Sequence, residues 1–138
     1  MQSFEVLGHT ADLSVRAHGR DLRELTENAA RGLLALLYRG EPPPAEGHQD
    51  LTVTAQEPEY LVQRALRELL YLLEDGGLAP VSVEVVAAAG GSARLRVGTV
   101  PLAAAKALLG AEIKAVTRHG LEIVKEPDGL SLTVVFDV

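Results

Sequence analysis

The sequence predicts an α+β two-layer sandwich, in which two helices pack on a mostly antiparallel sheet. Two long segments carry leucine at helical spacing, and several shorter segments alternate apolar and polar residues. Glycine-rich or proline-containing turns join neighbouring segments. No internal repeat is present, and 138 residues is an ordinary length for one domain. We therefore expect residues 1–138 to form a single domain.

The N-terminal part of the chain is predicted to form two strands, over residues 2–7 and 13–18. In the second strand, apolar side chains at odd positions alternate with Ser, Arg and His at even positions. This is the period of a half-buried strand. The polar residues 8–12 form a short break between the two strands.

The first helix is predicted to begin at Asp21 and to stop at Gly40. The Asp21 carboxylate can cap free backbone N–H groups, and Glu24 occupies the capping-box position three residues later. Residues 41–47 contain three consecutive prolines and must form a loop, because proline lacks the N–H donor. A strand-like segment follows at residues 51–54.

The second helix is predicted to begin at Pro58, since proline suits a first helical position, and to end at Gly76. Residues 81–85 and 93–97 alternate cleanly and flank Gly90-Gly91. Such a pattern is typical of a β-hairpin.

The C-terminal part is predicted to be mostly strand. Residues 101–109 fit either a short helix or an irregular loop. Residues 112–119 and 121–125 favour strands, and a Pro-Asp-Gly turn at 127–129 leads into a last strand over 130–138.

Composition excludes several classes of function. The formal charge of −6 and the aromatic fraction of 4% disfavour stable, direct nucleic-acid binding. The absence of cysteine excludes disulfides, thiolate nucleophiles and cysteine-ligated zinc. No apolar run approaches the 18 or so residues of a membrane span. We expect a cytoplasmic protein that does not bind membranes.

Carboxylates near both ends of the chain form the first candidate site. Asp12 is the last residue of the N-terminal break, and Asp137 precedes the terminal Val138 with its α-carboxylate. If the strands that carry them are neighbours, three hard oxygen groups can meet and suit Ca²⁺ or Mg²⁺ better than zinc. The alternative is that Asp12 is a turn residue and Asp137 a solvated terminal residue.

Basic residues in the 112–119 segment form the second candidate. As a strand, this segment would place Lys114 and Arg118 on one face, where they could hold a phosphate or an acidic partner. His119 would lie on the other face. The alternative is a solvated face whose charges limit aggregation.

The sequence resembles the archease family at three places, in the same order along the chain. The first is the His9-Thr10-Ala11-Asp12 break, followed by the helix that opens Asp21-Leu22-Arg23-Glu24-Leu25. The second is Glu112-Ile113-Lys114-Ala115-Val116-Thr117, with His119 following. The third is Val135-Phe136-Asp137-Val138.

The resemblance implies an accessory role and not catalysis. Archeases activate the RtcB-type RNA ligase of tRNA splicing and RNA repair, and they promote its guanylylation and turnover. The family also implies a strand-helix-strand-strand unit in the fold. It implies a divalent ion, first Ca²⁺ with Mg²⁺ and Mn²⁺ as alternatives, on residues matching Asp12, Asp137 and Val138. Candidate contacts with the ligase are His9, Thr10, Lys114, Arg118 and His119. The family often has an aromatic residue where Arg118 stands.

Two other functions compete with this interpretation. A metal-dependent phosphohydrolase could use the same carboxylates, although His9 is the only candidate general base near them in the sequence. A chaperone-like module would need no metal.

Overall fold

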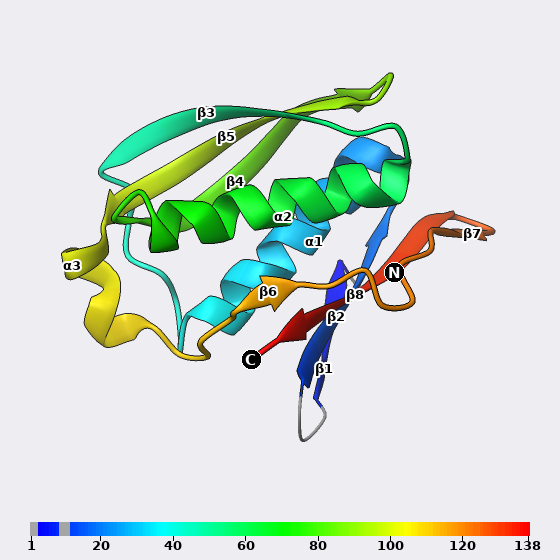
Figure 1. The fold of residues 1–138 in the computed structure, drawn as a ribbon. Coiled ribbons are helices and arrows are strands. Elements are labelled where there is room, and N and C mark those ends of the chain that lie inside the picture. The colour runs from blue at the N-terminus through cyan, green and yellow to red at the C-terminus, as the bar shows by residue number, and fades with distance from the viewer. Residues whose placement is uncertain (1–2, 9–11) are drawn as a thin grey trace.

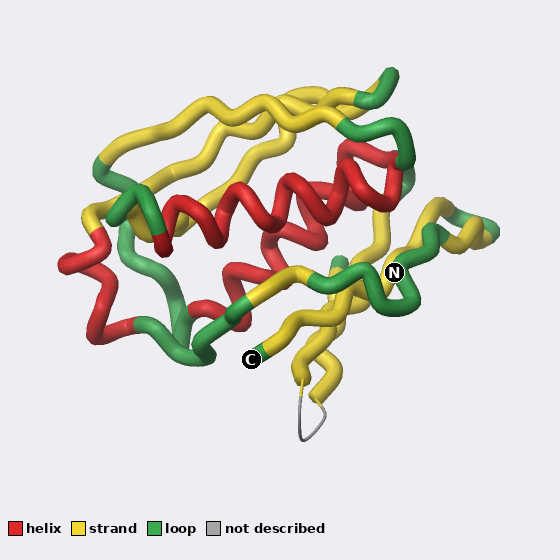
Figure 2. The backbone as a smooth tube through the Cα atoms, in the orientation of Figure 1, coloured by secondary structure: helices red, strands yellow, loops and turns green. Residues whose placement is uncertain are grey.

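The computed structural model describes residues 3–8 and 12–138 of the chain. Two long helices lie between two antiparallel sheets (Figure 1). Figure 2 shows the same layers, with the helices in red and the strands in yellow on both sides. The predicted α+β sandwich with antiparallel strands is confirmed, and the strands are divided between two sheets.

The first sheet, here called the β8 sheet, joins the two ends of the chain. Its path is β1-β2-β8-β6, and β7 also pairs with β8. The strands are β1 (Phe4–Gly8), β2 (Asp12–Gly19), β6 (Ala115–Val116), β7 (Val124–Glu126) and β8 (Gly129–Asp137).

The second sheet, here called the β5 sheet, has the order β3-β5-β4. It consists of β3 (Gly47–Thr54), β4 (Leu78–Ala89) and β5 (Ser92–Pro101). Gly90 and Gly91 turn the β4–β5 hairpin with φ of 62° and 77°, which confirms the predicted hairpin and explains its two glycines. Together with the helix between β3 and β4, these strands form the expected strand-helix-strand-strand unit.

The two long helices are α1 (Leu22–Leu37) and α2 (Pro58–Glu74). Asp21 caps α1 as predicted, because its Oδ1 accepts the Glu24 N–H at 2.9 Å. The helix nevertheless ends before Gly40, at Tyr38, whose hydroxyl donates to the Pro80 carbonyl at 2.8 Å. The Tyr38 backbone is extended and forms an antiparallel bridge with Leu109, so the chain has left the helix before the glycine.

Helix α1 holds the two sheets together. Oε1 of the buried Glu27 accepts the Val85 N–H of β4 at 2.9 Å, and Nδ2 of Asn28 donates to the His18 carbonyl of β2 at 2.7 Å. Gly32 packs so tightly under β2 that a Cβ there would lie 2.4 Å from Cγ1 of Val15. The geometry of β2 therefore depends on α1.

The region between residues 101 and 126 differs most from the prediction. Residues 101–109 contain a short helix, α3 (Leu102–Ala105), and a 3-10 turn, η1 (Lys106–Leu108). The long strands predicted at 112–119 and 121–125 are wrong in extent, because only β6 and β7 pair with β8 there. Ile113 and Val116 are both buried, three residues apart, so the side chains do not alternate as in a strand.

The core consists mainly of leucine, valine and alanine, and Phe136 of β8 is its largest fully buried side chain. None of the helices formed by residues 3–8 and 12–138 is long and apolar enough to cross a membrane.

Candidate metal centre

Strands β2 and β8 bring together the two aspartates near opposite ends of the chain. β2 begins at Asp12, β8 ends at Asp137, and the antiparallel register places these residues directly opposite each other. Directly opposite residues have Cβ atoms about 4.5–5.5 Å apart, and their side chains share one face of the sheet. The strand pairing that the metal hypothesis requires is therefore present.

Packing of the core fixes which face carries the carboxylates. Val134 and Phe136 of β8 are fully buried on the side of the helices. Since side chains alternate along a strand, Asp137 points to the opposite face. Asp12 is half-buried and Asp137 is exposed, so an ion from solvent can reach this corner.

A third strand completes the corner. Ala115 of β6 lies opposite Asp137 on the side away from β2, and the Lys114 N–H donates to the Asp137 carbonyl at 2.8 Å. These contacts hold the backbone of Asp137 between two neighbours. Val138 follows it directly, with 42% of its surface exposed.

The donor set fits a hard divalent cation. It contains two carboxylates and no sulfur or imidazole, which favours Ca²⁺ or Mg²⁺ over zinc. Within the part of the chain that the structure describes, no three His, Asp or Glu side chains gather into a metal cluster. Within residues 3–8 and 12–138, the other candidate ligands are backbone oxygens and the α-carboxylate of Val138, and water or a partner can add further oxygens.

The structure describes three of the five predicted partner-contact residues. His9 and Thr10 lie outside the described residues. Lys114 borders an apolar hollow of about 460 Å³, whereas Arg118 borders a different hollow of about 910 Å³. The strand expected to place Lys114 and Arg118 on one face covers only Ala115 and Val116, so the alternation on which that expectation rested does not reach either residue. His119 is exposed, and its N–H donates to Oγ1 of Thr117 at 3.2 Å.

Sequence reasoning missed the residues that surround Arg118. Its guanidinium lies over the Tyr60 ring, with Cζ 4.3 Å from the ring centre, and its Nε donates to Oε1 of Gln63 at 3.1 Å. Arg64 borders the same hollow. Tyr60 and Arg64 are four residues apart on α2, and this helical spacing was the available signal.

Known proteins match this chain over nearly its whole length. The model of the Archease protein family (MTH1598/TM1083) matches residues 4–138. Protein archease of Archaeoglobus fulgidus is 30% identical over 98% of each chain. That of Methanosarcina mazei is 30% identical over 99% of this chain and 97% of its own.

Solved structures share the fold. Protein 1598 of Methanobacterium thermoautotrophicum aligns over the full length of both chains with a TM-score of 0.73 and 23% identity. An archease from Thermotoga maritima, described as a "possible chaperone", aligns over 97% of this chain and 96% of its own, with a TM-score of 0.67 and 24% identity. The family match over nearly the whole length, together with the full-length relatives, shows that this chain belongs to the archease family.

Proposed function

We propose that this protein is a non-enzymatic, divalent-metal-binding activator of an RtcB-type RNA ligase, which promotes the ligase's guanylylation and turnover in a cytoplasmic RNA-joining pathway. Membership of the archease family supports the proposal, because its relatives are named for the family and not for a reaction. The observation that carries the metal-binding part is the Asp12–Asp137 cross-strand pair.

The Asp12–Asp137 pair differs from the cross-strand charge pairs of the β5 sheet. On the β5 sheet, Arg96 lies between Asp50 and Glu84, so each carboxylate has an opposite charge beside it. On the β8 sheet, Asp137 lies between Asp12 and Ala115. Like charges directly opposite each other destabilise a sheet. A bound cation would reverse the sign of this interaction.

We assign Asp12, Asp137 and the α-carboxylate of Val138 as the ligands. Ca²⁺ takes six to eight oxygen ligands, so three monodentate carboxylates would leave about three to five positions for water or for a partner. When bound, the ion would supply a compact positive charge at an exposed corner of the protein. Such a corner suits contact with a partner's phosphate or carboxylate groups.

The ligase supplies the direct test. We expect this protein with Ca²⁺ to accelerate guanylylation of an RtcB-type ligase, and Asp12→Asn and Asp137→Asn to lose that effect. Asp50→Asn is the matched control, because it removes the same charge from an exposed strand position of the other sheet. No acceleration by the wild-type protein would contradict the proposed function.

The two competing functions predict different results. Hydrolysis of phosphoesters by the purified chain alone, lost in Asp137→Asn, would favour a phosphohydrolase. Suppression of aggregation of an unrelated protein, with no dependence on metal, would favour the chaperone function suggested by the description of the Thermotoga maritima relative.

Lys114 lies between the metal corner and the neighbouring apolar hollow. Its backbone N–H holds Asp137, while its exposed side chain borders the apolar hollow with Leu73 and Leu109. We propose that this side chain contacts the ligase or its bound nucleotide. Lys114→Ala keeps the backbone hydrogen bond, so it should weaken activation while metal affinity stays unchanged. Full activation by Lys114→Ala would remove this side chain from the mechanism.

A further inference from the structure

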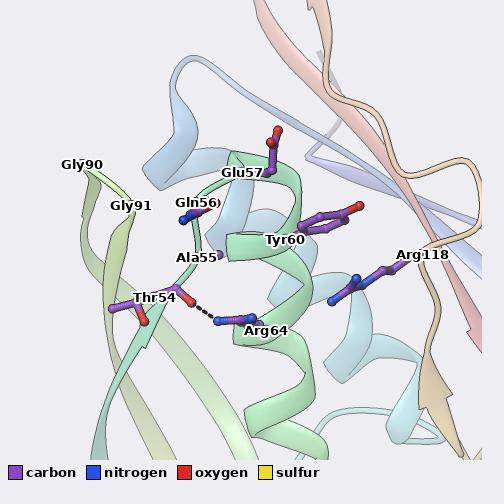
Figure 3. Close-up of a pocket in the computed structure, with 9 residues that line it drawn as sticks. All are labelled: Thr54, Ala55, Gln56, Glu57, Tyr60, Arg64, Gly90, Gly91 and Arg118. Carbon is purple, nitrogen blue, oxygen red and sulfur yellow. Dashed lines mark hydrogen bonds between the residues drawn. The ribbon is translucent and has the colours of Figure 1, made fainter.

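An open hollow of about 910 Å³ lies at the N-terminal end of α2. Its walls come from the end of β3, the first turns of α2, the Gly90-Gly91 turn and Arg118 (Figure 3). Neither the proposed metal ligands nor Lys114 lines this hollow, whereas Arg118, a candidate ligase contact from the sequence, does. Its arginine side chains give it a distinct chemistry.

Arg118 is held in a fixed orientation. Its guanidinium stacks on the Tyr60 ring, and its Nε donates to Oε1 of Gln63 at 3.1 Å. Gln63 is itself only 4% exposed, and its Nε2 donates to the Val116 carbonyl at 3.0 Å. A buried side chain anchored to β6 therefore positions an arginine that would otherwise be mobile. No residue in the described ranges accepts a hydrogen bond from the N–H groups at the far end of this guanidinium, so these groups can engage a ligand.

Arg64 is held from the other side of the hollow. Its Nη1 donates to the Thr54 carbonyl at the end of β3. Figure 3 shows that the Arg118 side chain extends toward α2. In this view its guanidinium lies below Tyr60, on the side of Arg64. Two positioned guanidinium groups thus line one hollow, and each keeps unused donors.

Nearby carboxylates do not neutralise these two arginines. Among the ion pairs within 4.0 Å that the described residues form, none includes Arg64 or Arg118. Glu57 lines the hollow, but its carboxylate points away from both guanidinium groups (Figure 3). The Glu59 carboxylate accepts the Ile123 N–H at 3.1 Å. The hollow is therefore locally basic on a protein of formal charge −6.

We propose that this hollow binds a phosphate monoester, carried either by a free nucleotide or by the end of a short RNA. A phosphate monoester bears a charge of about −1.5 to −2 at neutral pH and offers three acceptor oxygens. It can therefore engage two guanidinium forks at once, whereas one carboxylate is satisfied by a single fork. The N-terminal end of α2 adds a favourable dipole.

The negative net charge of the protein favours a ligand with a single phosphate over a long polyanion. A long polyanion would extend beyond the hollow over a protein of formal charge −6, and nucleic-acid affinity depends on the number of phosphates that are neutralised. A single terminal phosphate meets only the basic hollow. This inference depends on neither the metal nor the ligase, so its failure would leave the proposed function untouched.

Calorimetric titration of the full chain, in low salt with EDTA, tests the proposal. The probes are inorganic phosphate, adenosine 5′-monophosphate, and a tetraribonucleotide with and without a 5′-phosphate. The phosphorylated tetranucleotide should bind about tenfold or more tightly than its unphosphorylated form, as expected for charge-assisted hydrogen bonds. A gain in affinity from inorganic phosphate to the nucleotide would show that base or ribose also contacts the hollow, and equal affinities would show recognition of phosphate alone.

Variants assign the binding to this hollow. Arg64→Gln and Arg118→Gln should each lower affinity for the phosphorylated tetranucleotide about tenfold. Arg67→Gln is the matched control, because Arg67 lies on the same helix and also over a tyrosine, with Cζ 5.5 Å from the Tyr71 ring centre, yet does not line the hollow. Melting curves should show that all three variants fold.

Several results would overturn the proposal. These are the absence of phosphate binding by the wild-type chain, equal affinity for the two tetranucleotides, and an equal loss in the Arg67→Gln control. Tighter binding of a hexaglutamate peptide than of the phosphorylated tetranucleotide would identify an acidic peptide as the ligand instead.

Discussion

Replacing Asp137 by asparagine should stabilise the metal-free protein. Asp137 lies directly opposite Asp12, so the two carboxylates are about 5 Å apart if they extend in parallel. Two unit charges at that distance repel by about 0.8 kcal/mol in bulk water and by about 3 kcal/mol at an effective dielectric of 20. Asp137 is exposed and Asp12 is half-buried, which favours the lower part of this range. We expect the free energy of unfolding to rise by about 1 kcal/mol.

Calcium should invert the order of stability. A ligand that binds only the folded state stabilises it by about 2.7 kcal/mol at one hundred times its dissociation constant. The wild-type protein should gain this amount, whereas Asp137→Asn should gain almost nothing. The variant is therefore expected to be the more stable protein in EDTA and the less stable one in saturating calcium.

Urea unfolding followed by circular dichroism, with EDTA and then with calcium, measures both differences. The control is Asp50→Asn, since Asp50 lies opposite Arg96 and its loss should lower stability slightly with no calcium dependence. An Asp137→Asn protein that is less stable than wild type in EDTA would refute the repulsion argument. An equal response of both proteins to calcium would refute the ligand assignment.

Three further predictions test the terminus, the helix packing and the acid limit of stability. A Gly-Ser extension after Val138 should weaken calcium binding in a titration, because it moves the α-carboxylate away, whereas an N-terminal tag should not. Gly32→Ala should lower the free energy of unfolding by about 1–3 kcal/mol through overpacking, since its Cβ would lie 2.4 Å from a side-chain methyl of β2. Gly40→Ala, with no atom within 4 Å, should change stability little in the same urea titration. The hydrogen bond from Arg20 holds the pKa of Glu24 below its ordinary value. The ionised Glu24 side chain therefore stabilises the fold at pH values above the ordinary pKa, and this stabilisation is lost as the pH falls through the lowered pKa. Glu24→Gln should therefore flatten the acid limb of a stability–pH curve, and an unchanged curve would contradict this assignment.

The regular elements of the fold could be predicted from local patterns. The caps and turns that matter most are local, as with Asp21 at the start of α1 and the Gly90-Gly91 hairpin. The end of α1 could not be predicted in this way. At that end, the Tyr38 backbone bridges to Leu109 and its hydroxyl donates to Pro80, and both contacts join residues far apart in the sequence.

The segment around β6 shows why patterns fail where pairing is short. Its apparent alternation predicted one long strand, but only Ala115 and Val116 pair with β8. Beyond them, the chain is held by side chains of α2, through Gln63 to Arg118 and Glu59 to Ile123. These tertiary hydrogen bonds replace the backbone ladder that a strand would need. As a result, the Arg118 side chain packs against Tyr60 and Gln63 of α2.

The candidate metal site was partly predictable for a different reason. The residue types could be read directly, but the pairing of β2 with β8 depends on the whole sheet. The same fact links metal binding to folding. Asp12 and Asp137 are close only when the two ends of the chain have met, so the unfolded chain offers no preformed site and metal affinity becomes folding free energy. The resulting gain of about 2.7 kcal/mol at one hundred times the dissociation constant exceeds the repulsion of about 1 kcal/mol in the metal-free protein. An aspartate pair that weakens the metal-free sheet can therefore strengthen the metal-bound one. Metal should slow the separation of β8 from β2 more than it slows the separation of strands in the β5 sheet.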